Sequence, residues 1–306
     1  MASYVEELAR AAEGMAPLNV AWDCGHGATG PVVERLAPYL PGRHHLLNTA
    51  VDGRFPAHHP DPAEAANLSQ LAATVVAEGC DLGVAFDGDG DRLGVVDAQG
   101  RILWADQLLL LLARDLLQTR PGATVVADVK CSKVLFDGVA QAGGRCAQSA
   151  SGYVLVREAM EREGALLAGE LSGHIFFGDG WGGADDAIYA ALRTFLAVSR
   201  LPGGLAAFRD SLPPSYATPE LRIPCVEERK AAVVAEVAGR VTDDGAAFDP
   251  EMGLRVEGPD GWWLLRASGT EPKLTCRCES VHPDGLERLR AELKEQLRQS
   301  GLETGI

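Results

Sequence analysis

Short apolar runs alternate with longer amphipathic stretches over the first hundred residues. The runs are typical of buried strands, and the stretches carry apolar residues at helical spacing. The predicted strands cover 18–23, 45–47, 82–86 and 93–96, and the predicted helices begin near residue 3 or cover 31–40 and 68–78. Because strands that alternate with helices pair in parallel through right-handed crossovers, we predict an α/β domain over residues 1–99.

Residues 100–203 repeat the same plan. The run 124–128 resembles 19–23, and in both an aspartate is followed by a short polar loop and a helix. This similarity is a faint internal repeat at the scale of a domain. A later strand at 166–169 and a closing helix at about 185–198 complete a second predicted α/β domain.

The last part of the chain changes class. Glycine and proline at 202–204 and 213–214 mark a boundary and a linker. Beyond them the pattern predicts an antiparallel sheet with helices, an α+β domain over residues 213–306. Its predicted strands are 221–224, 254–257, 262–266 and 274–278, and its predicted helices are 227–241 and 285–298.

Composition narrows the class of protein. The chain has 306 residues, a net charge of −15 and a pI near 4.9, which argues against a nucleic-acid or anionic-membrane surface. The leucine run 108–112 is too short to span a bilayer. The seven cysteines form an odd set without a Cys-x-x-Cys motif, and the N-terminus resembles an acidic helix rather than a signal peptide. We therefore expect a reduced, cytoplasmic protein.

One loop carries three carboxylates at alternate positions. Asp87, Asp89 and Asp91 are separated by glycines and followed by Arg92. Their charges repel unless something neutralises them, and the glycines let the backbone bring them together. Oxygen ligands on a short loop suit a hard cation, Mg²⁺ before Ca²⁺. An EF-hand is disfavoured because Arg92 stands where glycine is expected and Ala98 where glutamate is. A solvated acidic turn is the alternative.

Two places offer an imidazole beside other polar groups. Glu170, Ser172 and His174 follow a predicted strand, and a carboxylate, a hydroxyl and an imidazole on one tight loop suit the vicinal hydroxyls of a sugar. A lone His174 would instead be structural. His58 and His59 lie between prolines, where paired histidines are more often ordinary loop residues than ligands.

A third polar loop lies between two strands of the last domain. Residues 266–272 combine Arg266 with Ser268, Gly269 and Thr270. A guanidinium, hydroxyls and backbone N–H groups made available by glycine form a phosphate cradle. A polar hairpin loop without a ligand is the alternative.

Together the three loops, in this order and at these separations, resemble the α-D-phosphohexomutases, specifically the phosphomannomutase/phosphoglucomutase group. The motifs are Asp-Gly-Asp-Gly-Asp-Arg at 87–92, Gly-Glu-Leu-Ser-Gly-His at 169–174 and Arg-Ala-Ser-Gly-Thr-Glu-Pro at 266–272. Stretches at 55–60, 128–132, 174–177 and 185–186 extend the likeness over nearly the whole chain. Phosphoglucosamine mutases, an alternative, share the Ser-Gly-His element, but residues 175–189 look more like the mannose/glucose group.

The resemblance implies an exchange between hexose 1-phosphate and hexose 6-phosphate, of mannose or glucose, through a hexose 1,6-bisphosphate. In that mechanism a phosphorylated serine donates and recovers the phosphoryl group. Asp87, Asp89 and Asp91 would hold Mg²⁺, with Arg92 beside the transferring group and Lys130 as an electrostatic or acid/base partner. The implied substrate contacts are Glu170, Ser172 and His174 for sugar hydroxyls, and Arg266, Ser268, Gly269 and Thr270 for the phosphate that is not reacting.

Two departures from the family pattern matter. The family carries its phosphoserine in a preceding domain, in a Thr-Ala-Ser-His-Asn-Pro-like loop that these 306 residues do not contain. We expect the chain to correspond to family domains two to four, as a fragment, a mis-started reading frame or a natural short form, and to be inactive alone. A non-catalytic sugar-phosphate-binding or regulatory protein is the rival hypothesis. Second, Tyr153 stands where the family has histidine, and Arg157 follows it instead of lysine.

Overall fold

The computed structural model describes residues 1–241, 246–249, 252–269 and 271–305. The chain divides into two compact units, Met1–Leu212 and Pro213–Ile306. Each unit is described by itself below.

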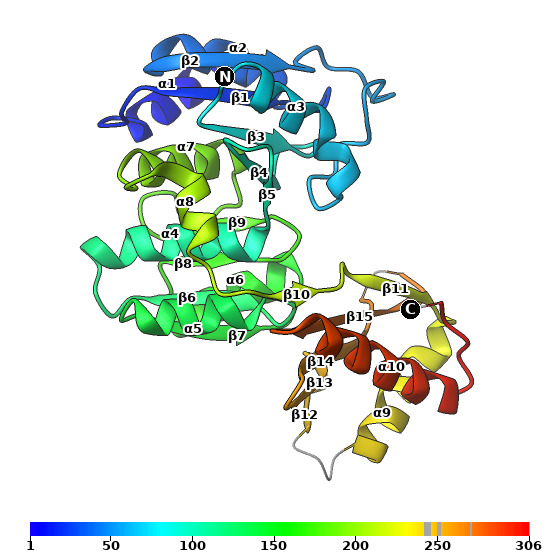
Figure 1. Ribbon diagram of the computed structural model, residues 1–306. Helices are drawn as coiled ribbons and strands as arrows, with labels where there is room; N and C mark the ends of the chain where they lie inside the picture. The colour runs from blue at the N-terminus through cyan, green and yellow to red at the C-terminus, as the bar shows by residue number, and fades with distance from the viewer. Residues whose placement is uncertain (242–245, 250–251, 270, 306) are drawn as a thin grey trace. The chain divides into compact units, whose positions relative to one another are not determined.

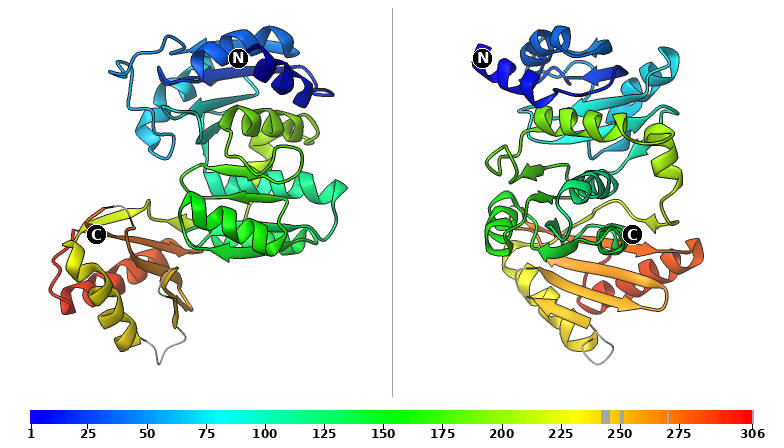
Figure 2. Two further views of the ribbon diagram at one scale, coloured as in Figure 1. Left: turned by 180° about the vertical axis from the view of Figure 1, so that it is seen from behind. Right: turned by 90° about the vertical axis from the view of Figure 1, so that its left-hand side faces the viewer.

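A five-stranded sheet lies in the N-terminal part of the first unit, with the strand order β2-β1-β3-β4-β5 (Figures 1 and 2). Its strands are β1 (Leu18–Asp23), β2 (Gly42–Leu47), β3 (Leu82–Phe86), β4 (Leu93–Asp97) and β5 (Ile102–Leu103). β1 pairs in parallel with β2 and β3, whereas β3 with β4 and β4 with β5 are antiparallel pairs. The chain therefore turns back at the end of β3, and the aspartate loop (residues 87–92) is that turn.

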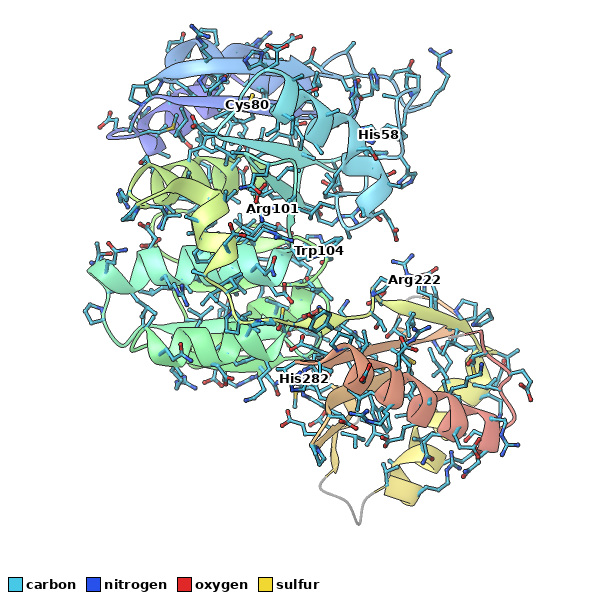
Figure 3. All side chains as sticks on the ribbon, in the orientation of Figure 1. His58, Cys80, Arg101, Trp104, Arg222 and His282 are labelled. Atoms are coloured by element: carbon cyan, nitrogen blue, oxygen red, sulfur yellow. The ribbon has the colours of Figure 1, made fainter. Side chains whose placement is uncertain are left out.

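The turn between β4 and β5 is built around Asp97. Its buried carboxylate accepts hydrogen bonds from the N–H groups of Gln99 at 2.9 Å and Arg101 at 3.0 Å, and it pairs with the Arg101 guanidinium at 2.7 Å. Arg101, labelled in Figure 3, also pairs with Asp210 of α8 (Gly204–Asp210) at 2.7 Å. This turn is thereby tied to α8.

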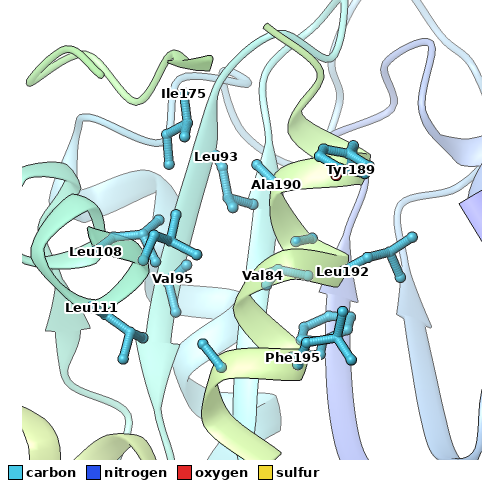
Figure 4. Close-up of a cluster of buried hydrophobic side chains, with 14 of the residues drawn as sticks. Val84, Leu93, Val95, Leu108, Leu111, Ile175, Tyr189, Ala190, Leu192 and Phe195 are labelled. Atoms are coloured by element: carbon cyan, nitrogen blue, oxygen red, sulfur yellow. The ribbon is translucent and has the colours of Figure 1, made fainter. Parts of the chain in front are cut away.

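Alternate residues of the sheet face helices on opposite sides. Ala21 and Ala85 pack with α3 (Ser69–Ala77). Val84 packs in the larger core with α7 (Ala187–Ser199), which Figure 4 shows beside these strands. Because successive side chains of a strand point to opposite faces, a sheet covered on both faces buries consecutive residues, as in β3. The remaining helices here are α1 (Ala2–Ala11) and α2 (Gly30–Leu36), with the 3-10 turns η1 (Ala37–Tyr39) and η2 (Ala65–Leu68).

The same topology recurs in a second sheet of this unit, ordered β7-β6-β8-β9. β6 is parallel to β7 and β8, and β8 is antiparallel to β9, which matches the relation of β1 to β2 and β3 and of β3 to β4. The strands are β6 (Thr124–Asp128), β7 (Arg145–Ser149), β8 (Leu167–Gly169) and β9 (Ile175–Phe177). The faint repeat in the sequence is confirmed at the level of strand order and direction.

Helices also cover both faces of the second sheet. Val125 packs in one core with α4 (Ala105–Thr119) and α5 (Lys133–Gln141), and its neighbour Val126 packs with α6 (Tyr153–Glu163) on the other face. The predicted α/β class is therefore confirmed for both sheets.

One hydrophobic core runs from α1 through both sheets to α8. The leucines at 108–112 are all buried in it on α4. Among the described residues, no helix has the length and apolar character needed to cross a membrane. Because the two α/β domains share this core, no gap between compact units marks the boundary near residue 99, and that boundary stays a prediction.

The second unit is an antiparallel sheet with two helices, as predicted. The sheet order is β10-β15-β14-β13-β12, and β11 also pairs with β15. One face of the sheet packs Leu254, Trp263 and Cys276 against α9 (Glu227–Val241) and α10 (Pro283–Gln299). The strands are β10 (Tyr216–Ala217), β11 (Leu221–Pro224), β12 (Ala246–Asp249), β13 (Gly253–Gly258), β14 (Gly261–Ala267) and β15 (Lys273–Ser280).

Candidate active site

The aspartate loop folds around its first member, Asp87. This carboxylate is fully buried, and its Oδ1 accepts hydrogen bonds from the backbone N–H groups of Gly90 at 3.0 Å and of Asp91 and Arg92 at 3.1 Å. Gly90 adopts a φ of +88°, and a Cβ there would lie 2.6 Å from Cγ2 of Thr29. The turn that closes the loop therefore requires glycine at this position.

The structure brings the three predicted carboxylates together. One oxygen each from Asp87, Asp89 and Asp91 lies within 4.8 Å of the others. The Arg92 guanidinium lies 2.7 Å from Asp87 Oδ2 and 3.2 Å from Asp61 Oδ1, so one cation faces several carboxylates. An oxygen-only donor set with excess negative charge suits Mg²⁺. The role of these residues as metal ligands stays a prediction.

Two carboxylates of the loop have opposite pKa shifts. Burial raises the pKa of Asp87 to about 6, with a further rise from Asp91 and an opposing effect of Arg92. A hydrogen bond with His174 lowers the pKa of Asp91 to about 2, against the effect of burial. Asp91 is therefore ionised at neutral pH, and a cation beside Asp87 would favour the ionised form that burial disfavours.

The 170–174 loop lies directly against the aspartate loop. It connects β8 to β9, the same place in the second sheet that the aspartate loop has in the first. Arg92 and His174 form an isolated antiparallel bridge, and the N–H of Leu93 donates to Gly173 O at 3.0 Å. His174 Nε2 lies 3.3 Å from Asp91 Oδ2. Asp91 and His174, which are 83 positions apart in the sequence, thus lie in one site.

Glu170 and Lys130 follow neighbouring strands, β8 and β6. Glu170 is buried, its Oε2 accepts the N–H of Gly152 at 2.8 Å, and its Oε1 lies 3.5 Å from His174 Nδ1. Burial, and after it the charge of Asp128, raises the pKa of Glu170. Lys130 Nζ lies 3.6 Å from Asp128 Oδ2. A carboxylate and an ammonium therefore lie at the carboxyl ends of parallel strands, where ligands bind in such sheets.

His174 is the centre of a polar cluster. Its Nδ1 lies 2.8 Å from the Ser172 hydroxyl. Burial alone lowers the pKa of His174, but Asp91, Glu170 and Asp185 outweigh burial and raise it. Asp185, Asp91 and His174 also bring one ligand atom each within 4.8 Å of the others. The structure places all three predicted residues of the 170–174 loop in or beside this cluster, and their contact with a sugar stays a prediction.

Tyr153, the departure from the family pattern, begins α6 next to this cluster. It follows Gly152, whose N–H binds Glu170. Tyr153 is 43% exposed, its hydroxyl accepts a hydrogen bond from Arg157 at 3.3 Å, and its ring lies 5.6 Å from that of Phe176. A phenol held by Arg157 therefore occupies the edge of the site.

The paired histidines of the proline-rich loop lie outside the carboxylate cluster. His58, labelled in Figure 3, has its Nε2 2.8 Å from Oδ2 of the buried Asp23 at the end of β1. The His59 ring lies 6.4 Å from the ring of Phe55. Within the described residues, neither belongs to a group that could hold a metal.

The 266–272 loop joins β14 to β15 in the second unit. The N–H of Ser268 donates to Lys273 O at 3.0 Å, and the Ser268 hydroxyl accepts the N–H of Glu271 at 3.2 Å. Gly269 has no left-handed φ, and a Cβ there would meet no atom within 4 Å. Thr270 lies outside the described residues. The roles of Arg266, Ser268 and Gly269 in phosphate binding stay predictions.

One residue at this loop was missed by sequence reasoning. Lys230 is only 5% exposed, and its Nζ donates to Ser268 O at 2.5 Å and to Glu271 O at 3.0 Å. The available signal was its place on α9, where it shares the buried stripe with Val233, Val234 and Val237. A lysine on the apolar stripe of a helix needs a buried partner.

Family profiles match most of this chain, in three consecutive segments. Phosphoglucomutase/phosphomannomutase alpha/beta/alpha domain II matches residues 2–100, alpha/beta/alpha domain III matches 104–216, and the C-terminal domain matches 220–296. The chain belongs to the phosphoglucomutase/phosphomannomutase family. The resemblance carried by the three loops is thereby confirmed.

Individual relatives agree with this assignment. The chain is 40% identical over 282 residues to a phosphomannomutase/phosphoglucomutase of Pseudomonas aeruginosa, covering 92% of this chain and 61% of the relative. A family protein of Burkholderia thailandensis has a solved structure with a TM-score of 0.88 and 36% identity, covering 98% of this chain and 64% of that one. The chain thus spans about 60% of the length of the curated relatives it matches.

A more distant solved structure shares the fold. It is that of N-acetylphosphoglucosamine mutase of Aspergillus fumigatus in complex with GlcNAc-6P and magnesium. It has a TM-score of 0.70 and 16% identity, and the match covers 97% of this chain and 65% of that one.

Proposed function

We propose that this chain supplies the metal, sugar and distal-phosphate sites of a phosphomannomutase/phosphoglucomutase. The reaction is the exchange of hexose 1-phosphate and hexose 6-phosphate, of mannose or glucose, through a hexose 1,6-bisphosphate. The observation that carries the proposal is the direct contact between the aspartate loop and the 170–174 loop, with His174 3.3 Å from Asp91. The aspartate loop and the 170–174 loop are thus adjacent in one compact unit, which supports their proposed roles as metal loop and sugar loop.

Each loop has a distinct task in this proposal. Asp87, Asp89 and Asp91 hold Mg²⁺, which when bound would neutralise charge on a transferring phosphoryl group. A magnesium ion in the related Aspergillus fumigatus structure supports this choice of metal. Arg92 already lies beside Asp87 at 2.7 Å and adds positive charge at the same place.

The remaining residues hold the substrate. Sugar hydroxyls exchange hydrogen bonds with Glu170, Ser172 and His174. Lys130 holds or moves a proton at the end of β6. Arg266, Ser268 and Gly269 bind the phosphate that is not reacting, since charge-assisted bonds from a guanidinium to phosphate are strong. Thr270 is proposed for the same task from the sequence motif alone.

These residues position the substrate and neutralise charge on the phosphoryl group. Covalent relay of that group also needs a side chain that accepts it. Ser172 and Ser268 are assigned to substrate contacts, and the other serines do not lie in a phosphoserine motif of the family. We therefore expect the 306 residues, expressed by themselves, not to interconvert hexose 1- and 6-phosphates.

The test is a coupled mutase assay with added hexose 1,6-bisphosphate, with and without a separately expressed phosphoserine domain from a relative. Turnover only with the added domain supports the proposal. Turnover by the chain alone, above a variant with Asp87, Asp89 and Asp91 changed to Asn, would show that the nucleophile is misplaced here. Tight hexose-phosphate binding with no turnover in either mixture would favour the non-catalytic alternative.

A further inference from the structure

A buried lysine lies against the backbone of the 266–272 loop. Lys230 is in the first turn of α9, is 5% exposed and donates to the carbonyl oxygens of Ser268 at 2.5 Å and Glu271 at 3.0 Å. Its Nζ also pairs at 2.8 Å with Glu227, whose side chain is 66% exposed. Burying an ammonium is unfavourable unless its donors are satisfied, and here they are satisfied mainly by this loop.

These bonds decide which backbone groups of the loop remain available. The carbonyl oxygens of Ser268 and Glu271 point to Lys230, and the N–H groups of the same two residues bond to Lys273 O and to the Ser268 hydroxyl. The N–H of Gly269 donates to no group within the described residues. A loop whose carbonyl oxygens are engaged by a cation and whose N–H is exposed is suited to an anion.

We propose that Lys230 is a positioning residue for phosphate binding by the 266–272 loop. It fixes the loop through two carbonyl oxygens, and its positive charge favours an anion on the loop. The inference rests on the proposed function, because it requires this loop to bind the phosphate of a hexose phosphate. Glu227 opposes the second effect, since its carboxylate partly neutralises the ammonium and, within the described part of the loop, makes no bond to it.

The experiment is calorimetric titration of the chain with glucose 1,6-bisphosphate. Lys230→Met removes both effects, and we expect about tenfold weaker binding. Glu227→Gln keeps the carbonyl bonds and removes the opposing charge, and we expect about twofold tighter binding. Lys294→Met, which removes an exposed lysine of α10 in the same unit, is the matched control and should bind as the unchanged chain does. Because removing a nearby carboxylate favours a bound anion in any case, tighter binding by the Glu227 variant supports the inference only together with weaker binding by Lys230→Met.

The outcomes separate this inference from the function it rests on. Unchanged binding by a folded Lys230→Met variant overturns the role of Lys230, provided that Arg266→Ala weakens binding. Unchanged binding by Arg266→Ala overturns the phosphate loop itself. If Lys230→Met does not fold, Lys230→Gln replaces it, because glutamine keeps a side-chain N–H donor for the carbonyl oxygens of Ser268 and Glu271 and loses the positive charge. Weaker binding by that variant supports the inference, and unchanged binding overturns it.

Discussion

The aspartate loop and the 266–272 loop are both turns between antiparallel strands. They differ in the sign of the buried charge that bonds to the loop backbone. In the first, the buried carboxylate of Asp87 accepts three backbone N–H groups of its own loop. In the second, the buried ammonium of Lys230 donates to two carbonyl oxygens of a loop that belongs to another element. The groups left at the surface of each loop differ accordingly.

If the proposed function is correct, this difference lets one acidic chain offer sites for ions of both signs. The buried carboxylate of Asp87 accepts the N–H donors of its own loop. The carboxylates of Asp89 and Asp91 are then the groups that would face a cation. The buried ammonium of Lys230 donates to two carbonyl oxygens of the 266–272 loop. The N–H of Gly269 is then the group that would face an anion. The fixed charge inside each loop therefore has the same sign as the groups presented outside, and a bound ion of the opposite sign relieves the repulsion.

The largest expected effect is on Asp87. Asp87→Ala leaves three half-buried N–H groups without their acceptor and removes the nearest carboxylate partner of the Arg92 guanidinium, which keeps Asp61. We expect it to lower the free energy of unfolding by about 3 kcal/mol. Mg²⁺ binding should be lost as well. Urea denaturation and calorimetry measure the two effects.

Asp97→Ala is the matched control for this variant. Asp97 is also a fully buried aspartate that accepts backbone N–H groups and pairs with an arginine, Arg101, but in a turn outside the site. It should cost similar stability and leave Mg²⁺ binding intact. Loss of Mg²⁺ binding in both variants would mean that general destabilisation, and not a ligand, is being measured.

The next effect tests the opposite loop. Arg266→Ala should weaken hexose-phosphate binding by about 1.5–3 kcal/mol, the usual contribution of a hydrogen bond to a charged group. The binding should weaken with or without Mg²⁺, because this loop uses no metal. Arg298→Ala, at an exposed arginine of α10, should bind as the unchanged chain does. Equal affinities in all three proteins would contradict phosphate binding by this loop.

The sequence predicted more of the aspartate loop than of the 266–272 loop. Alternating aspartates and glycines, with apolar runs on both sides, were sufficient to predict the strands, the turn and the convergence of carboxylates. The contact of Arg92 with His174 was not predictable from spacing, because it depends on how two sheets with the same topology pack through one core. Lys230 was missed because it contacts the loop through backbone carbonyl oxygens, which no side-chain motif in the sequence reveals.

A glycine-to-alanine change in each loop gives a smaller expected effect and compares the two loops directly. Gly90→Ala places a Cβ in a left-handed conformation and against Thr29, and we expect a loss of about 1–2 kcal/mol in the free energy of unfolding. Gly269→Ala meets open space at an ordinary φ and should change that free energy by less than about 0.5 kcal/mol. Thermal and urea denaturation of both variants check this. Equal losses would contradict the claim that only the aspartate loop is shaped by its glycine.

The smallest expected effect on the folded protein is at Asp89, and it separates ligand from scaffold within the aspartate loop. Asp89 is exposed, and among the described residues its carboxylate accepts no hydrogen bond, in contrast to the buried Asp87. Asp89→Asn should therefore change the free energy of unfolding by no more than about 0.5 kcal/mol without metal. Removing one negative ligand should still weaken Mg²⁺ binding, so added Mg²⁺ should raise the melting temperature of the unchanged chain more than that of the variant. Equal Mg²⁺ affinity by calorimetry would remove Asp89 from the metal site, and a large loss of stability without metal would show that its carboxylate supports the loop itself.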